Sequence, residues 1–157
     1  MSQTRRRGFT LIELLVVICI IGILTGLVTV GITAALNSSK ANSSELMLQG
    51  ISAALATYQT RWGDYPPTSL MDIGGRGLND TNNGVEALVA CLASTRRGPK
   101  LYDPPALEQY VNTDADKASS NLTGWYFGAN DLLEYSDFFG NLILYMHHRD
   151  YARPRAG

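Results

Sequence analysis

The sequence predicts an α+β protein with one long N-terminal helix packed on a small head of short helices and an antiparallel β-sheet. Three observations predict this fold: an apolar segment of membrane length near the N-terminus, an amphipathic helical pattern after it, and short β-forming segments separated by turn residues in the second half. The chain has 157 residues, of which 45% are apolar and 17% charged. This composition fits one anchor segment and one modest head.

The first element is the apolar segment, which contains no charged side chain from Leu14 to Asn37. At about 1.5 Å per helical residue it is long enough to cross a hydrocarbon core of about 30 Å. Three arginines, residues 5–7, precede it and hold the N-terminus on the cytoplasmic side by the positive-inside rule. A secretory signal peptide would have a shorter apolar region, of about 7–15 residues, before its cleavage site. The pattern therefore favours a retained membrane span.

Glu13 is the unusual residue of this region, because it places a carboxylate at the edge of an otherwise uncharged span. Charged side chains at membrane depth are costly and rare unless they have a partner or a task. A plain single-span anchor does not explain Glu13. We therefore expect Glu13 to have a specific function.

The run from Arg5 to Ile18, which includes Gly8, Phe9 and Glu13, resembles the leader and first helical turns of type IV pilins and type II secretion pseudopilins. The resemblance implies that a prepilin peptidase cuts between Gly8 and Phe9 and methylates the new N-terminus to N-methylphenylalanine. It also implies that the apolar segment is retained. The expected division is a cleaved cytoplasmic leader over 1–8, a transmembrane and filament-core helix over 9–36, and a head over 37–157.

The expected partner of Glu13 follows from this cleavage, which would leave a positively charged amine on Phe9. Phe9 and Glu13 are four residues apart, so in a helix both lie on one face of the first turn, where the helix dipole favours a negative group. We expect the amine, within one subunit or from a neighbouring one, to pair with the Glu13 carboxylate during filament assembly. The resemblance implies the same role for this glutamate.

The second half of the long helix has an apolar stripe, and the helix is expected to run from Phe9 to about Arg61 before Pro66 and Pro67. The stripe consists of Met47, Leu48, Ile51, Ala54, Leu55 and Tyr58. A shorter helix is predicted after Asn82 or Asn83, and another near residues 103–111. In the first of these two helices, the expected buried face consists of Val85, Leu88, Val89 and Leu92. Three segments are rich in β-forming residues: 125–127, 132–135 and 142–147. The second and third of them flank a turn at 139–141.

Three islands in the head resemble the G-type, or major, pseudopilin of type II secretion: Tyr65–Thr68, Asn83–Leu88 and Ser136–Tyr145. The last island departs from that family at Phe138 and Phe139, which replace a proline and a tryptophan. The resemblance implies a structural subunit of a pseudopilus that drives protein export. Its implied location is the bacterial inner membrane, as a single-pass protein with a cytoplasmic N-terminus and a periplasmic head, and then the pseudopilus.

The implied partners are the prepilin peptidase, other copies of the chain, minor pseudopilins, the inner-membrane assembly platform and the lipid bilayer. Two alternatives remain open within and outside this class. One is a subunit of a type IV pilus or a competence pseudopilus, and the other is a single-span membrane-anchored binding module. The net charge of −1, with no basic patch among aromatic residues, argues against a nucleic-acid partner.

No enzymatic motif is present, so we expect a protein that is not an enzyme and has no catalytic residue. His147 and His148 are adjacent, and on a strand they would point to opposite faces, which argues against a metal site. Five carboxylates offer oxygen ligands for calcium: Asp114, Asp116, Asp131, Glu134 and Asp137. In the G-type family the calcium loop follows the turn of the third island, where this chain has only Asp150. We therefore expect solvated loops and no bound cofactor, with calcium as the alternative.

Overall fold

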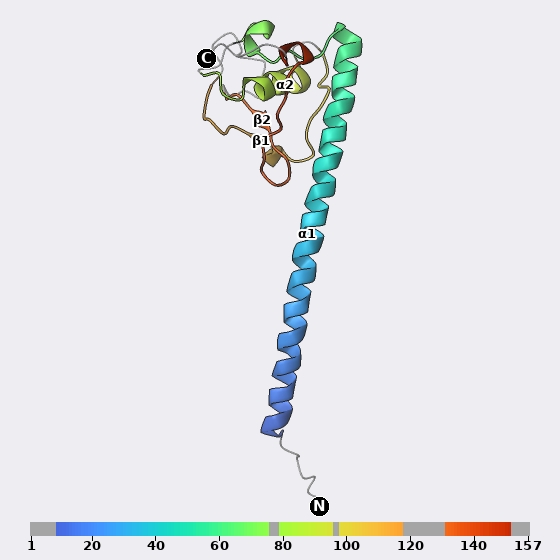
Figure 1. Ribbon diagram of the computed structural model, residues 1–157, viewed down its shortest axis with the longest axis vertical. Coiled ribbons are helices and arrows are strands. Elements are labelled where there is room, and N and C mark those ends of the chain that lie inside the picture. Colours follow the sequence, from blue (N-terminus) through green and yellow to red (C-terminus); the bar gives the residue numbers. More distant parts are fainter. Residues whose placement is uncertain (1–8, 76–78, 96–97, 118–130, 152–157) are drawn as a thin grey trace, which may run out of the picture. The chain divides into compact units, whose positions relative to one another are not determined.

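The computed structural model describes residues 9–75, 79–95, 98–117 and 131–151. It confirms the predicted α+β class, with a long N-terminal helix, short helices and a two-stranded antiparallel sheet (Figure 1). The elements in chain order are α1 (Leu11–Trp62), η1 (Leu70–Ile73), α2 (Asn83–Ala93), η2 (Leu107–Gln109), β1 (Tyr110–Val111), β2 (Glu134–Tyr135) and η4 (His148–Asp150). The chain divides into two compact units, Met1–Lys40 and Ala41–Gly157.

The first part of α1 has the properties of a membrane span. Within the described residues α1 is the one helix long and apolar enough to cross a membrane, with a mean hydropathy of 2.9 in its most apolar window and none of that window buried. Its threonine hydroxyls bond to carbonyl groups of their own helix: Thr25 Oγ1 donates to Ile21 O at 2.7 Å and Thr29 Oγ1 to Thr25 O at 2.9 Å. These polar groups are therefore satisfied without water, as a hydrocarbon environment requires.

The second part of α1 contributes one narrow face to the core of the head. Met47, Ile51, Ala54 and Tyr58 are buried, at spacings of four, three and four residues. Leu48 was predicted on this face, but half of its surface is exposed. One residue corresponds to about 100° around a helix, so Leu48 lies beside the buried stripe while Ile51 lies within it.

The helix α1 ends close to the predicted position. The helix ends at Trp62, and Gly63 follows in the left-handed region with φ 82°. The amide of Gly63 donates to Gln59 O at 2.8 Å, which satisfies a carbonyl of the last turn. Glycine suits this position because it has no Cβ to clash in the left-handed conformation. The two prolines at positions 66 and 67 then keep the chain extended.

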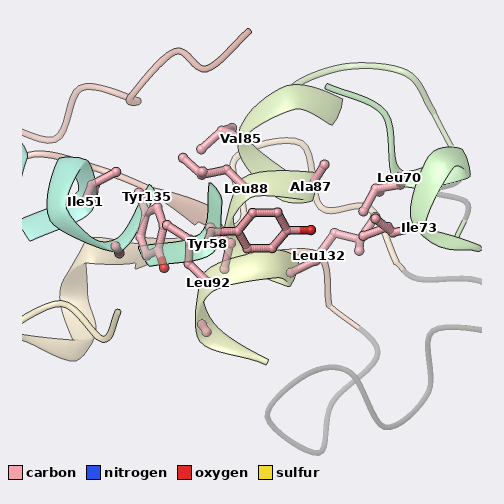
Figure 2. Close-up of a cluster of buried hydrophobic side chains, with 14 of the residues drawn as sticks. Ile51, Tyr58, Leu70, Ile73, Val85, Ala87, Leu88, Leu92, Leu132 and Tyr135 are labelled. Carbon is pink, nitrogen blue, oxygen red and sulfur yellow. The ribbon is translucent and has the colours of Figure 1, made fainter. Parts of the chain in front are cut away.

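Helix α2 lies in the middle of the core and is buried on nearly every side. The predicted face is buried, and Glu86, Ala87, Ala90 and Ala93 are buried as well. Figure 2 shows Leu88 and Leu92 of α2 among Tyr58 of α1, Leu132 and Tyr135. Asn82 is the residue that precedes α2, but its side chain makes no capping hydrogen bond to the helix. Gly84 is required because a Cβ there would overlap the carbonyl group of Tyr145.

The two-stranded sheet pairs Tyr110 with Tyr135 and Val111 with Glu134. A helix was predicted near 103–111, but only the short η2 forms there, because Tyr110 and Val111 pair with β2. Segments 132–135 and 142–147 flank a turn, as predicted, and they are joined across it by an isolated bridge between Ser136 and Leu142 and by the amide of Ile143, which donates to Tyr135 O at 2.9 Å.

A tight turn joins these two segments. The Asp137 carboxylate accepts hydrogen bonds from the amides of Phe139 and Asn141, each at 2.8 Å, and Gly140 adopts φ 85°. Beyond the turn, the amide of His147 donates to the hydroxyl of Thr68 at 2.8 Å. The predicted β-forming residues 125–127 lie outside the described part of the chain.

Candidate functional site at the start of helix α1

The side chains of Thr10 and Glu13 form a reciprocal cap at the start of α1. Glu13 Oε2 accepts hydrogen bonds from Thr10 N at 2.8 Å and from Thr10 Oγ1 at 2.6 Å. In return, Thr10 Oγ1 accepts from Glu13 N at 3.3 Å. This is the capping-box arrangement, in which the residue before the helix and its third residue satisfy each other's backbone amides. The Glu13 carboxylate is thereby fixed beside the first turn, where the helix dipole favours it.

The position of Phe9 corrects the expectation that Phe9 and Glu13 share the first turn. α1 begins at Leu11, so Phe9 lies outside the helix, and 80% of its surface is exposed. Since Gly8 precedes it in the sequence, the nitrogen of Phe9 is a peptide nitrogen in this chain. The carboxylate has Thr10, rather than Phe9, as its partner. Gly8 itself lies outside the described residues.

The surroundings of Glu13 are apolar. Phe9, Ile12, Val16 and Val17 line an open hollow beside it. Its second carboxylate oxygen, Oε1, accepts no hydrogen bond from the part of the chain that the structure describes. No nucleophile or second titratable group lines this hollow. The arrangement can therefore bind a positively charged group next to an apolar surface, and it contains no set of groups for catalysis.

The capping box was not predicted from the sequence, although a signal for it was present. The pattern Thr10-Leu11-Ile12-Glu13 has the threonine and glutamate spacing of this motif and directly precedes an apolar run. The amine of Phe9 was the predicted partner of Glu13, whereas the hydroxyl of Thr10 is its partner in the structure. The same residue therefore has a local structural partner in addition to its predicted role in assembly.

A comparison with known families agrees with this location of the site. Residues 3–29 match the model of the prokaryotic N-terminal methylation motif, which is typical of type IV pilin-like proteins. Among curated proteins and solved structures, none matches the chain. The match covers residues 3–8 of the expected leader, the capping box and most of the apolar segment. The N-terminal segment of this chain therefore carries a pilin-type methylation motif on a helix that is apolar enough to anchor it in a membrane.

The two histidines contradict the geometry expected of them. Their rings lie together, with centroids 4.2 Å apart, because His148 starts the short helix η4 and does not continue a strand. His147 is buried; its Nε2 lies 3.1 Å from Asp64 Oδ1, and its Nδ1 accepts from Arg149 N at 3.1 Å. Nδ1 is an acceptor, so the proton is on Nε2 and is donated to Asp64. Both ring nitrogens therefore have protein partners.

The predicted acidic residues separate into different environments. Asp137 holds the turn described above, and the backbone of Asp131 forms an isolated bridge with Lys117. Glu134 is buried and fully hydrogen-bonded to its neighbours, whereas Asp114 and Asp116 meet Glu86 of α2. Glu86 was not predicted as a ligand, because its position in an apolar helical pattern gives no indication of a polar neighbour. These three carboxylates form one of two groups among the described residues whose ligand atoms lie close enough to hold a metal ion, the other being Asp64, His147 and His148.

Proposed function

We propose that this protein is the structural subunit of a type II secretion pseudopilus, made as a precursor in the inner membrane. In this proposal a prepilin peptidase removes residues 1–8 and methylates Phe9, and Glu13 then guides assembly into a filament that drives protein export. The methylation motif over residues 3–29 supports the pilin-like class. The choice of a secretion pseudopilus rests on the three islands of the head that resemble the G-type subunit.

One observation supports the role of Glu13 in assembly. Its carboxylate is held by Thr10 through Oε2 at the exposed start of the apolar helix, with apolar residues around it. Because the carboxylate is already fixed, a neighbouring amine can approach it without first ordering a long flexible side chain. An ion pair formed in this apolar setting is screened less than one in water. Assembly would thereby replace an isolated charge in the bilayer by a paired charge in a bundle of helices.

The leader is the first point to test. The chain would be expressed in membranes with and without a prepilin peptidase, and the intact mass of the product measured. We expect loss of residues 1–8 and one added methyl group on the amine of Phe9. A product that retains its leader would contradict the proposal and would favour a membrane-anchored binding module.

The role of Glu13 is tested by two substitutions, Glu13→Ala and Glu13→Gln. Both variants should insert and be cut, because the apolar segment and the leader are unchanged, and both should fail to form filaments. Glu45→Ala is the matched control, since it removes an exposed glutamate from the same helix, in the part that belongs to the head. Normal filaments from Glu13→Gln would show that the charge is not required.

The filament type needs a separate comparison. The chain would be supplied to cells that have either a type II secretion assembly platform or a type IV pilus platform, each without its own major subunit. We expect filaments and cargo export with the secretion platform only. Filaments with the pilus platform alone would favour the alternative, a subunit of a pilus or of a competence pseudopilus.

A further inference from the structure

An apolar hollow opens on the surface of the head where α1 ends. Its lining includes Tyr58 and Trp62 from α1, Cys91 from α2, and Pro99 and Leu101 from the segment that follows α2. None of the described lining residues carries a charge. The hollow therefore offers a mainly apolar surface to whatever approaches it.

Arg61 places a positive charge beside this hollow. Its guanidinium carbon lies 5.3 Å from the centre of the Trp62 ring, which is within the range of a cation–π contact. Gly98 leaves room for the same guanidinium, because a Cβ at that position would come within 3.2 Å of Arg61 Nη1. Arg61 is exposed, and no described residue forms an ion pair with it. The head thus holds a positive charge next to an apolar surface.

The short helix η2 has the complementary pair of side chains. Leu107 is 81% exposed, and among the large apolar side chains of the described head only Leu144 is more exposed. Glu108 follows it, is also exposed, and forms no ion pair with a described residue. The nearby Asp103 differs, because it pairs with Lys100 at 2.9 Å. Helix η2 therefore presents an apolar side chain directly beside a carboxylate that has no cationic partner among the described residues.

The two surfaces lie at different levels along α1. Tyr102, which precedes η2, lies against Gly50, since a Cβ there would come within 2.7 Å of its ring. Arg61 is 11 residues further along α1, or about 16 Å at the rise of an α-helix. Figure 1 shows β1, the strand that directly follows η2, displaced along α1 from the end of that helix. A contact between the two surfaces would therefore displace one copy along the helix axis of the next.

We propose that η2 of one copy docks on the end of α1 of a second copy, with Leu107 in the hollow and Glu108 paired with Arg61. This contact rests on the proposed filament function, for which it names one junction between heads. The two surfaces differ, so the contact is heterologous and can repeat from copy to copy without closing into a dimer.

The occupant follows from charge and residue type. Residues 94–100, which lead to the hollow, contain three basic side chains and no acidic one, so an acidic partner is favoured there. Leu107 would exclude water from beside the pair of Glu108 and Arg61, and screening of their attraction would then be weaker than at an open surface. Arginine, tyrosine and tryptophan are also the residue types that contribute most at protein interfaces. Helix η2 of a second copy supplies both the apolar and the acidic group.

Cross-linking tests the contact directly. Cysteine would be introduced as Leu107→Cys or Pro99→Cys in the full chain carrying Cys19→Ala and Cys91→Ser, and a short bismaleimide linker would be added to membranes. Each single variant should remain monomeric, an equal mixture should give dimers, and the double variant should give a ladder of longer oligomers. No dimer from the mixture, or as much dimer from one single variant, would overturn the proposal. This measurement does not require that filaments form.

Charge reversal tests the ion pair. Glu108→Arg or Arg61→Glu should lower the cross-linked yield by about tenfold or more, and both reversals in one chain should restore it because the pair is recreated with opposite signs. Asp80→Arg is the matched control, since it reverses another exposed carboxylate of the head and should leave the yield unchanged. Equal losses in the control and in the double reversal would contradict the pairing. Absence of filaments from the unsubstituted chain would contradict the proposed function, whereas normal cross-linking by Glu108→Arg would contradict this contact alone.

Discussion

The two candidate core residues Ile51 and Leu48 provide the sharpest test of how α1 packs on the head. Sequence periodicity placed both in one apolar stripe, whereas only 4% of the surface of Ile51 is exposed in the structure, compared with 50% of that of Leu48. Ile51→Ala removes a side chain from the centre of the core and should leave a cavity. Leu48→Ala removes a side chain of the same size that is half in solvent. The pair therefore separates burial from helix propensity.

The expected magnitudes differ several-fold. A buried isoleucine replaced by alanine typically costs about 2–5 kcal/mol of the free energy of unfolding, because transfer and cavity costs add. Leu48 has half the burial and leaves no enclosed cavity, so its replacement should cost about 0.8–1.5 kcal/mol, which is half of a full transfer energy of about 1.5–3 kcal/mol. Helix propensity slightly favours alanine at both positions and does not reverse the order.

The assay is thermal unfolding of the full chain in detergent, followed by near-ultraviolet circular dichroism of the head's aromatic residues. At about 3–6 °C for each kcal/mol, Ile51→Ala should lower the melting temperature by roughly 6–30 °C and Leu48→Ala by roughly 2–9 °C. The comparison would be repeated by denaturant titration to confirm the order. If the two variants lose equal stability, the packing of α1 described above is incorrect.

Two further predictions concern the head. Gly84→Ala should destabilise it by roughly 1–3 kcal/mol, because the new Cβ would overlap the carbonyl of Tyr145, whereas Gly22→Ala has open space and should leave the melting temperature of the head unchanged. The hydrogen bond from His147 holds the pKa of Asp64 below its usual value. This stabilisation is present above the unfolded-state pKa of about 3.9 and is lost as the pH falls through the lower folded-state pKa. As the pH is lowered through this range, the melting temperature of Asp64→Asn should fall less than that of the unsubstituted chain. Equal falls in the two proteins would show that the pair of His147 and Asp64 adds no stability.

The sequence was sufficient for the features that depend on neighbouring residues. The length of the apolar run, the glycine and prolines after Trp62, and the apolar spacing of α2 each predicted an element that the structure contains. The candidate site at Glu13 was also recognisable, since an isolated carboxylate beside an apolar run is conspicuous in any reading. Its bond to Thr10 is local too, and the spacing of the two residues signals it.

The sequence was insufficient where contacts join distant segments. The pairing of Tyr110 with Tyr135 was not predicted, because a long stretch separates the two residues and nothing in their local patterns favours it. The predicted geometry of the two histidines was wrong for a related reason: His147 contacts Asp64, and the chain there does not continue as a strand. Local periodicity carries no information about either contact.

The sequence by itself determined the anchor, the pilin-type motif, and the existence of a long helix with a small head, because these depend on hydrophobicity and spacing within a few turns. Only the tertiary structure decided which face of α1 is buried and that Glu86 meets Asp114 and Asp116. Burial depends on which segments share the same space. Glu86, in the middle of an apolar helix, acquires polar neighbours only because the fold brings two aspartates beside it.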